Sequence, residues 1–225
     1  TRWIILVGKV SSRFVRQLRA NGFSLVLADM RPPIRDVDAV VCDDAAGAYD
    51  ATRHLAKLGH ERIALIRGPA RHPFFEALTG GYRRALDEAG IPASDALVLE
   101  AALSPQGGYD AAEALLALPA RPTAIFTNDD MAIGALRAIH ERGLRVPEDI
   151  AVVGFDDIEY AAHTTPPLTT VAVPKEEMGR LAVRQAIAQM EQGEQHVYST
   201  TVVAHSLVIR SSCGADMQPA PAHRS

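Results

Sequence analysis

The chain has 225 residues, 48% of them hydrophobic, and a formal net charge of −4 at neutral pH. This length and apolar content allow a sizeable core, in one large domain or two small ones, and the acidic balance gives no basic footprint for binding nucleic acid. The sequence shows no charged-then-apolar leader and no apolar run of about 18 residues, so neither export nor a membrane span is predicted.

Apolar runs typical of buried strands alternate with segments of helical apolar spacing along the chain. The predicted strands are 3–7, 25–28, 39–42, 63–66, 97–99, 124–126, 150–153, 169–173, 197–203 and 206–209. One predicted helix is capped by Ser11 and Ser12 and ends at Gly22, and another runs through 82–89 after a loop at 70–76. Further helices are predicted at 45–58, 107–118, 130–142 and 175–192. This alternation predicts an α/β fold with right-handed βαβ crossovers and parallel sheets.

Short polar residues follow two of these strands. Asn128 comes after the strand 124–126, and Asp156 and Asp157 come after the strand 150–153. Ligands collect beyond the carboxyl ends of parallel strands, and these donors and acceptors suit a small molecule with hydroxyls or amines. The alternative is local capping, in which Asn128 or Asp129 caps the next helix and Asp157 caps a short turn at 158–162.

Several segments carry a resemblance to a known family. PTAIFTNDDMAIGALRAIHERGL and VPEDIAVVGFDDIEYAAHTTPPLTTV resemble the core of the lactose/galactose repressor (LacI/GalR) family of bacterial transcription regulators. HLAKLGHERIALIRGP, GGYRRALDEAGI and HSLVIRSSCG extend the resemblance from about Trp3 to Gly214. It implies a periplasmic-binding-protein-like effector domain, with two Rossmann-like parallel-sheet subdomains joined by crossing strands.

The resemblance also implies the division of the chain. The N-terminal subdomain is expected at 1–42 and 173–203, the C-terminal subdomain at 43–172 and 204–212, and a flexible tail at 213–225. The family pattern places a DNA-binding headpiece, a hinge and two βα units ahead of the strand 3–7. Without those units, that strand is expected to form a sheet edge with unpaired backbone groups and uncovered apolar faces.

The effector site implied by the resemblance lies between the two subdomains. Asp29 and Met30 match positions that face it from one side, and Asn128, Asp156 and Asp157 match positions that face it from the other. The chain departs from the family pattern at four further positions of the site, namely Phe74, Leu78, Leu103 and Val173. Leu78 stands where relatives often carry an arginine, so the resemblance implies a neutral, hydroxylated and partly apolar effector such as a sugar, a polyol or a nucleoside-like molecule.

The apolar positions of the helix 175–192 spread over more than half of its circumference. Packing on one sheet face needs an arc of roughly 100°. The surplus apolar surface predicts a partner. The resemblance implies that the partner is a second copy of the chain, which would be contacted by Met178, Leu181, Val183 and Ile187. The alternative is a helix buried between two elements of its own subdomain.

Catalytic and metal-binding patterns are weak. We find no nucleophile elbow, no glycine-rich phosphate loop, no Cys/His nucleophile pair and no His pair at metal-ligand spacing, so no cofactor and no metal are predicted. Cys42 and Cys213 lie far apart in sequence, which favours free thiols in a reducing cytoplasm. The predicted function is effector sensing and dimerisation in a transcription regulator that meets operator DNA through a headpiece absent from this chain. The alternatives are a periplasmic solute-binding receptor and an α/β enzyme that binds a nucleotide.

Overall fold

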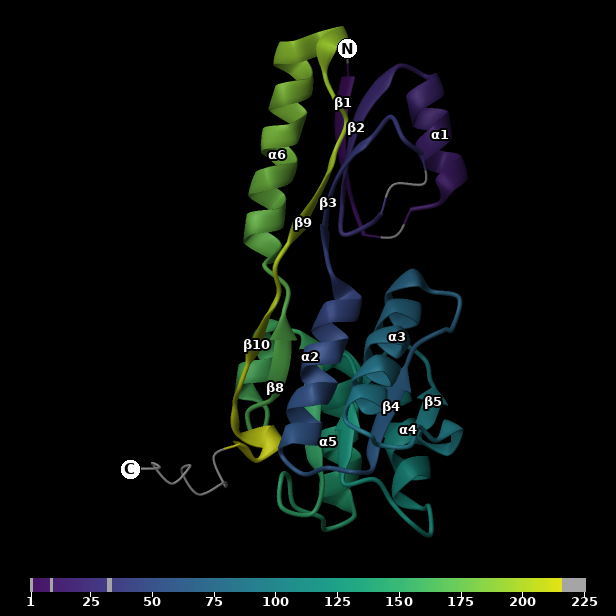
Figure 1. Cartoon of the computed structure of the whole chain (residues 1–225), viewed down its shortest axis with the longest axis vertical. Helices are drawn as coiled ribbons and strands as arrows, with labels where there is room; N and C mark the ends of the chain where they lie inside the picture. The colour runs from purple at the N-terminus through teal and green to yellow at the C-terminus, as the bar shows by residue number, and fades with distance from the viewer. Residues whose placement is uncertain (1, 9, 32–33, 216–225) are drawn as a thin grey trace, which may run out of the picture. The chain divides into compact units, whose positions relative to one another are not determined.

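A computed structural model describes residues 2–8, 10–31 and 34–215, and the chain forms two compact units (Figure 1). Unit 1 consists of Thr1–Asp43 and Val173–His205, and unit 2 consists of Asp44–Ala172 and Ser206–Ser225. Two of the three passages between the units lie within one residue of the predicted boundaries, and the third follows His205 instead of residue 203. The predicted α/β fold with two parallel-sheet units is confirmed.

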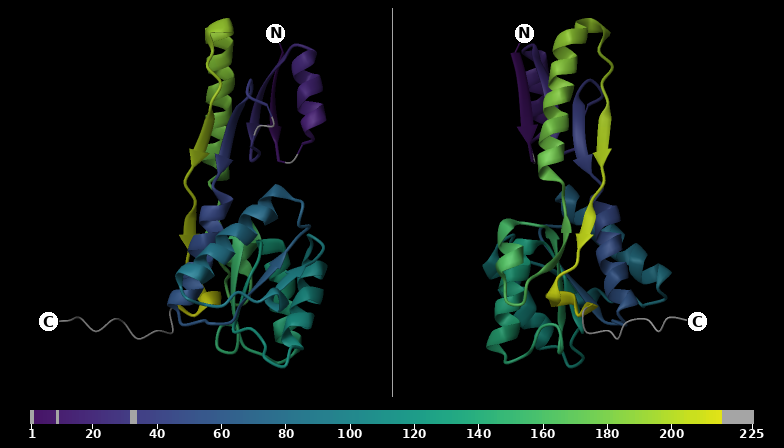
Figure 2. Two further views of the ribbon diagram at one scale, coloured as in Figure 1. Left: turned by 45° about the vertical axis from the view of Figure 1, so that its right-hand side comes forward. Right: turned by 90° about the vertical axis from the view of Figure 1, so that its left-hand side faces the viewer.

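Unit 1 is a parallel sheet of four strands with a helix on each face. The strand order is β1-β2-β3-β9, made of β1 (Arg2–Val7), β2 (Phe23–Ala28), β3 (Asp38–Cys42) and β9 (Thr200–Val203). Successive strand residues point to opposite faces. Leu25 and Leu27 therefore pack with α1 (Ser12–Ala20), and Val26 and Ala28 pack with α6 (Lys175–Gln192). Figure 2 shows α1 and α6 on opposite sides of these strands.

Strand β1 lies at the edge of this sheet and leaves apolar side chains uncovered, as the sequence predicted. Trp3 and Ile5 are each 37% exposed, and Val7 is 73% exposed.

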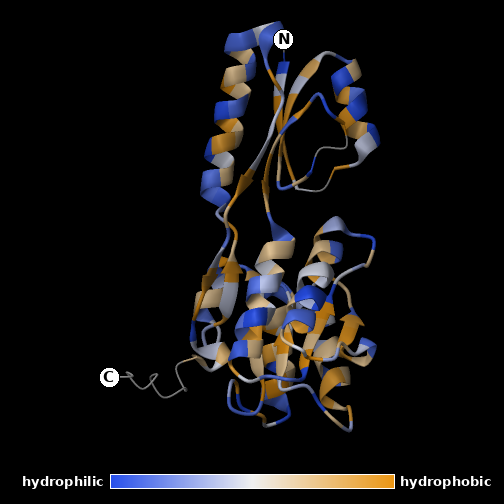
Figure 3. Ribbon diagram, viewed as in Figure 1, coloured by the Kyte–Doolittle hydropathy of each residue, from blue (hydrophilic) through white to orange (hydrophobic). Residues whose placement is uncertain are grey.

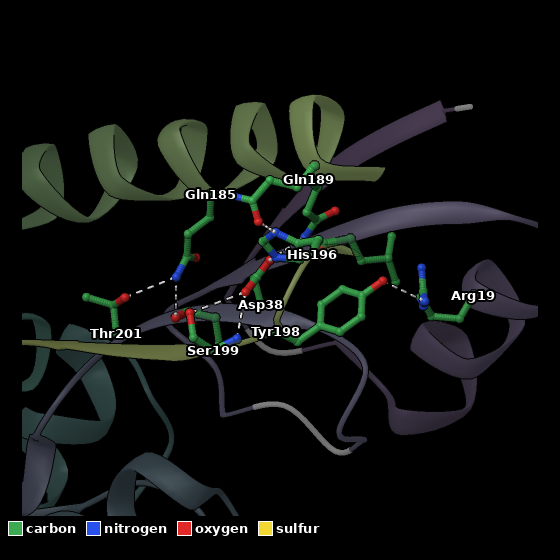
Figure 4. A network of polar contacts seen from close by, with 11 residues as sticks. Arg19, Asp38, Gln185, Gln189, His196, Tyr198, Ser199 and Thr201 are labelled. Atoms are coloured by element: carbon green, nitrogen blue, oxygen red, sulfur yellow. Dashed lines mark hydrogen bonds and ion pairs between the residues drawn. The ribbon is translucent and has the colours of Figure 1, made fainter. Parts of the chain in front are cut away.

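A buried carboxylate ties the end of α6 to the sheet of unit 1. Asp38 is completely buried, and it accepts hydrogen bonds from Gln189 Nε2 at 2.6 Å and from the Ser199 amide at 2.7 Å (Figure 4). The Nε2 atom of His196 lies 2.6 Å from the same carboxylate. A buried charge is tolerated only with such partners. These contacts fix α6 and the segment before β9 against β3.

Unit 2 contains a sheet of six strands in the order β10-β8-β7-β6-β4-β5. The strands are β4 (Ile63–Arg67), β5 (Val98–Glu100), β6 (Ala124–Phe126), β7 (Ala151–Asp156), β8 (Thr169–Ala172) and β10 (Ser206–Val208). All neighbours are parallel except β10, which is antiparallel to β8. Figure 3 shows strands of unit 2 in the orange of apolar residues. Strand β7 extends three residues beyond the predicted end, because Gly154 to Asp156 still pair with β8.

Two helix pairs cover the sheet of unit 2, namely α2 (Asp44–Lys57) with α3 (Pro73–Glu88), and α4 (Pro105–Leu116) with α5 (Asp129–Glu141). The adjacent residues Gly154 and Phe155 show that the pairs lie on opposite faces, because Gly154 packs on Asp129 of α5 and Phe155 packs on Gly47 of α2. Both pairs are close, because an added Cβ at Gly81 in α3 or at Gly108 in α4 would overlap the backbone of the partner helix.

Three expected boundaries need correction. Helix α3 begins at Pro73, so Phe74 lies in its first turn and not in a loop, because Pro73 suits a helix start. Only Thr200–Val203 of the predicted strand 197–203 is a strand, and the short 3₁₀ helix η3 (Gly193–Gln195) precedes it in the chain. The expected tail begins too early: Ser211–Cys213 form the 3₁₀ helix η4, and residues 216–225 of that tail lie outside the described ranges. Within those ranges no helix is both long and apolar enough to cross a membrane.

Candidate functional site

The carboxyl ends of neighbouring strands meet at one edge of the sheet in unit 2. Leu65 in β4 pairs with Phe126 in β6, and Phe126 pairs with Val153 in β7. Because these strands are parallel and in register, the residues that follow them share this edge. Asn128 and the pair Asp156 and Asp157 are thereby brought to the same edge, as a ligand site between adjacent strands requires.

Asn128 caps helix α5 and is 4% exposed. Its Oδ1 atom accepts a hydrogen bond from the Met131 amide at 3.4 Å. The capping alternative therefore holds for this residue. The cap uses the side-chain oxygen, so the amide nitrogen keeps two hydrogens that it can donate to a ligand.

Three aspartates predicted to face the effector have left-handed backbone. Asp29 has φ 62°, Asp156 has φ 114° and Asp157 has φ 47°, and no other non-glycine residue in the described part of the chain has a positive φ. This region is uncommon for residues other than glycine, and aspartate is among those that enter it most readily. Such backbone persists where the surroundings fix it, and it clusters at ligand sites.

Asp157 forms an ion pair that the sequence did not predict. Its Oδ1 atom lies 2.8 Å from Nη2 of Arg210, which follows β10, and both side chains are mostly buried. The sequence also allows Asp157 to act as a cap for the turn at 158–162. The 3₁₀ helix η2 (Glu159–His163) takes no side-chain cap at Ile158, whose amide donates to Asp129 instead. Arg210 also places a positive charge beside the Asp157 carboxylate.

An aromatic cluster lies beside the same strand end. Phe74 packs edge-on against Phe155 of β7, with ring centroids 5.2 Å apart, and against Phe75 at 4.9 Å. Phe155 directly precedes Asp156 in the chain, and contact of Phe74 with an effector stays a prediction. Leu78, one turn later in α3, is completely buried, which argues against contact with a ligand. The apolar surface near this edge is aromatic because α3 starts there.

The remaining predicted site residues differ in their surroundings. Leu103 is 52% exposed in the segment between β5 and α4. Met30 is partly buried in unit 1, where its sulfur accepts a hydrogen bond from the Val10 amide at 3.4 Å. Val173 is also partly buried and packs against the core beneath α6. Met30 and Val173 therefore contribute to the packing of unit 1, and their contact with an effector stays a prediction.

Arg67 adds a donor that the sequence reading missed. It ends strand β4, and its Nη2 atom lies 3.3 Å from the Glu100 carboxylate at the end of β5. Its Nε atom is buried and has no hydrogen-bond partner among the described residues. The strand ends of unit 2 thus offer cationic donors, an amide and carboxylate acceptors together. A hydroxyl both donates and accepts, so this mixture suits a polyhydroxylated ligand.

Two further features of unit 2, a hollow and a pair of side chains, involve none of the predicted site residues. A hollow of about 340 Å³ lies where α2 and α3 end, lined by residues such as His60, Glu61 and Ile91, and it contains no predicted site residue. His54 and Cys213 form a pair that the sequence did not reveal, with Nε2 and Sγ 3.3 Å apart. Cys213 is only 1% exposed, and burial lowers the pKa of His54. Among the described residues no group of three or more His, Cys, Asp or Glu could hold a metal ion.

The predicted interface helix α6 divides its apolar residues between two environments. Met178 is 4% exposed in the core of unit 1, and Leu181 packs partly buried against that core. The sheet of the same chain therefore covers Met178, whereas Leu181 keeps part of its side chain exposed and its place in an interface stays a prediction. Val183 and Ile187 are 49% and 46% exposed, and Met190, one turn further on, is 53% exposed.

Comparisons with known proteins agree with this architecture. A model of the periplasmic binding protein-like domain matches residues 52–213. The ribose operon repressor of Escherichia coli K12 is 41% identical over 168 residues, which cover 74% of this chain and 51% of the repressor. The ribose operon repressor of Haemophilus influenzae is 34% identical over 203 residues, which cover 89% of this chain and 61% of that protein. The chain thus spans about half to three fifths of these curated relatives.

Solved structures show the same fold. A LacI family transcriptional regulator from Enterococcus faecium, solved with bound ribose, has a TM-score of 0.85 and 30% identity, and the match covers 93% of this chain and 79% of that one. A complex of the transcriptional regulator CelR with cellobiose has a TM-score of 0.85 and 33% identity, with coverage of 94% and 66%. With its two parallel-sheet units and these matches, the chain belongs to the LacI family of transcription regulators and carries the family's periplasmic-binding-protein-like domain.

Proposed function

We propose that the chain is the effector-sensing part of a cytoplasmic transcription regulator, and that its effector is a small polyhydroxylated molecule. The observation that carries this proposal is the meeting of Asn128, Asp156 and Arg67 at the carboxyl ends of adjacent strands. These side chains supply amide, carboxylate and guanidinium groups, which match the donor and acceptor hydrogen bonds of hydroxyls. Phe74 adds an apolar aromatic surface beside them.

D-Ribose is the first effector to test. Two curated relatives are named ribose operon repressors, and a structural relative contains bound ribose. The mixed donors and acceptors of unit 2 are consistent with a neutral sugar. A pentose has few apolar groups for Phe74, so a nucleoside, which adds an aromatic base, is the second candidate class.

Regulation would follow from effector binding at the carboxyl ends of the strands in unit 2. A ligand that binds one conformation of the protein more tightly than another would favour that conformation. That conformation would decide how two copies of the protein present their DNA-binding parts to an operator. Val183 and Ile187 are the residues we assign to the contact between the copies, because they remain exposed on α6.

The proposal predicts binding without turnover. Isothermal titration of the purified protein with D-ribose, cellobiose and nucleosides, with chromatography of each ligand after incubation, measures both. We expect one of these ligands to bind and to be recovered unchanged. Recovery of a converted product would identify an enzyme instead. A periplasmic receptor of the same fold is the other candidate, but the relatives matched are transcription regulators, which favours the regulator.

A further inference from the structure

The turn after β7 needs an explanation for its conformation. Asp156 and Asp157 are consecutive residues with positive φ, at 114° and 47°. Two adjacent aspartates do not adopt this backbone unless their surroundings impose it. The groups that impose it also decide where the Asp156 carboxylate lies.

A buried carboxylate from a different strand end binds this turn. Asp129 is completely buried in the first turn of α5, and its Oδ2 atom accepts a hydrogen bond from the Ile158 amide at 2.9 Å. Its Oδ1 atom accepts one from the Thr170 hydroxyl at 2.6 Å. The Thr170 oxygen accepts in turn from the Asp157 amide at 3.4 Å. Two successive amides of the turn are therefore held, one directly by Asp129 and one through Thr170.

Strand β7 is shaped to accept this carboxylate. Gly154 faces Asp129, and a Cβ at this position would overlap the Oδ1 atom. The absence of a side chain lets the carboxylate lie against the strand itself.

Both oxygens of Asp129 act as acceptors, a role that the two oxygens of a carboxylate can fill together. An asparagine at this position has one acceptor oxygen, and its amide nitrogen would face either the Ile158 N–H or the Thr170 hydroxyl. The Ile158 N–H can only donate, so the two donors would oppose each other there. The position in the first turn of α5 also favours a negative charge, because the helix dipole is positive at that end.

We propose that Asp129 is a positioning residue of the effector site, which sets the turn Asp156 to Ile158 and so presents the Asp156 carboxylate to the ligand. This inference rests on the proposed function. Asp157 is held at its amide through Thr170 and at its carboxylate by Arg210. Asp156 is the residue that this arrangement places at the end of β7, where its backbone pairs with Ala172.

The test compares Asp129→Asn with the matched control Asp130→Asn in the same protein. Asp130 is the next residue and is exposed, so the control removes an equal charge from the same helix end. Amide hydrogen exchange and thermal unfolding report on the turn without a ligand, and calorimetric titration with D-ribose reports on binding. We expect Asp129→Asn to accelerate exchange at Asp157 and Ile158 selectively, and to weaken ribose binding about tenfold, the factor for one charged hydrogen bond. Asp130→Asn should change neither.

A second pair of variants distinguishes loss of the hydrogen bond through Thr170 from a general folding defect. Thr170→Val keeps the shape of the side chain and removes the hydroxyl link, so exchange should accelerate at Asp157 more than at Ile158. Thr170→Ser restores the hydroxyl and should restore slow exchange.

Several results would overturn the proposal. Unchanged exchange at Asp157 and Ile158 in Asp129→Asn would show that the carboxylate does not hold the turn. Equal acceleration throughout β6 and β7 would show a role in global stability alone. Ribose affinity that survives a loosened turn would show that the turn does not position the ligand contact. If the unaltered protein does not bind D-ribose, the choice of effector fails, while the exchange pattern still decides whether Asp129 holds the turn.

Discussion

The guanidinium of Arg210 donates one hydrogen bond to the Asp157 carboxylate and another to the Leu168 carbonyl, each at 2.8 Å. Arg210 thereby connects the segment after β10 to the turn after β7 and to the start of β8. These residues are far apart in sequence and meet because β10 pairs with β8. The contact holds the Asp157 carboxylate in place, and Asp156 is the aspartate that we propose for the effector.

A double-mutant cycle measures the Arg210 to Asp157 contact. We expect Asp157→Asn and Arg210→Gln each to lower the free energy of unfolding in urea. Both side chains are less than a third exposed, so the coupling energy should be about 1 kcal/mol. The loss in the double variant should therefore be smaller than the sum of the single losses. Strictly additive losses would show that the ion pair contributes nothing to stability.

Two adjacent glycines in α3 give opposite predictions. A Cβ at Gly80 would meet nothing nearby, so Gly80→Ala should stabilise the protein by about 0.5–1 kcal/mol through helix propensity. A Cβ at Gly81 would overlap the backbone of α2. Gly81→Ala should therefore destabilise it by about 1–3 kcal/mol, the usual cost of overpacking. Thermal unfolding of the pair checks this, and a stabilised Gly81→Ala variant would contradict the close packing of α2 on α3.

The sequence predicted the fold well because its signals are local. Apolar runs such as 63–66 and 150–153, and glycines such as Gly143 after α5, depend only on residues nearby in the chain. The resemblance to the LacI family then predicted where the chain passes from one unit to the other. Even there, the end of β7 was placed too early, because Gly154 and Asp156 interrupt the apolar pattern and the segment is strand through its pairing with β8.

The site was harder to predict because its structure depends on contacts between distant residues. Asp129 looked like a helix cap, and only its burial against Gly154 and Thr170 reveals another role. Arg210 lies in the segment HSLVIRSSCG, which carries part of the family resemblance but suggested no role for Arg210 in the site. Leu78 was placed by matching a family position, which carries no information about burial. Met178 and Leu181 were indistinguishable from Val183 and Ile187 by hydrophobicity, and the sheet of unit 1 separates them.

Stability should rise with pH between about 5.5 and 7.5. Burial lowers the pKa of His54, with a further contribution from Lys57, and burial also lowers the pKa of His60, with a contribution from His54. Unfolded histidines bind a proton near pH 6.5. The unfolded state therefore takes up protons first as the pH falls, and the free energy of unfolding decreases until the folded pKa values are passed.

Urea unfolding at several pH values checks this dependence. The variants His54→Gln and His60→Gln, made singly and together, should progressively flatten the curve in this range. A stability that falls as the pH rises from 5.5 to 7.5 would contradict the lowered pKa values. An unchanged slope in the double variant would assign the dependence to other groups.

The exposed residues Val183 and Ile187 on α6 give a prediction about the assembly of two copies of the chain. Val183→Asp combined with Ile187→Asp should convert a dimer to a folded monomer, because two charges would be placed in an apolar contact. Sedimentation velocity measures the change, and circular dichroism confirms that the fold is retained. Val197→Asp is the matched control, since Val197 is 80% exposed and lies beyond the helix. A variant that remains dimeric would show that the copies meet through another surface.

Calorimetric titration of the protein and of Asp156→Ala with D-ribose and a nucleoside tests the central claim most directly, with Asp87→Ala, an exposed aspartate at the end of α3, as the control. We predict that the unaltered protein and Asp87→Ala bind one of these ligands equally. Asp156→Ala should bind it at least about tenfold more weakly while remaining folded, because it loses a charged hydrogen bond. Equal affinity in all three proteins would show that the effector does not bind at the carboxyl end of β7.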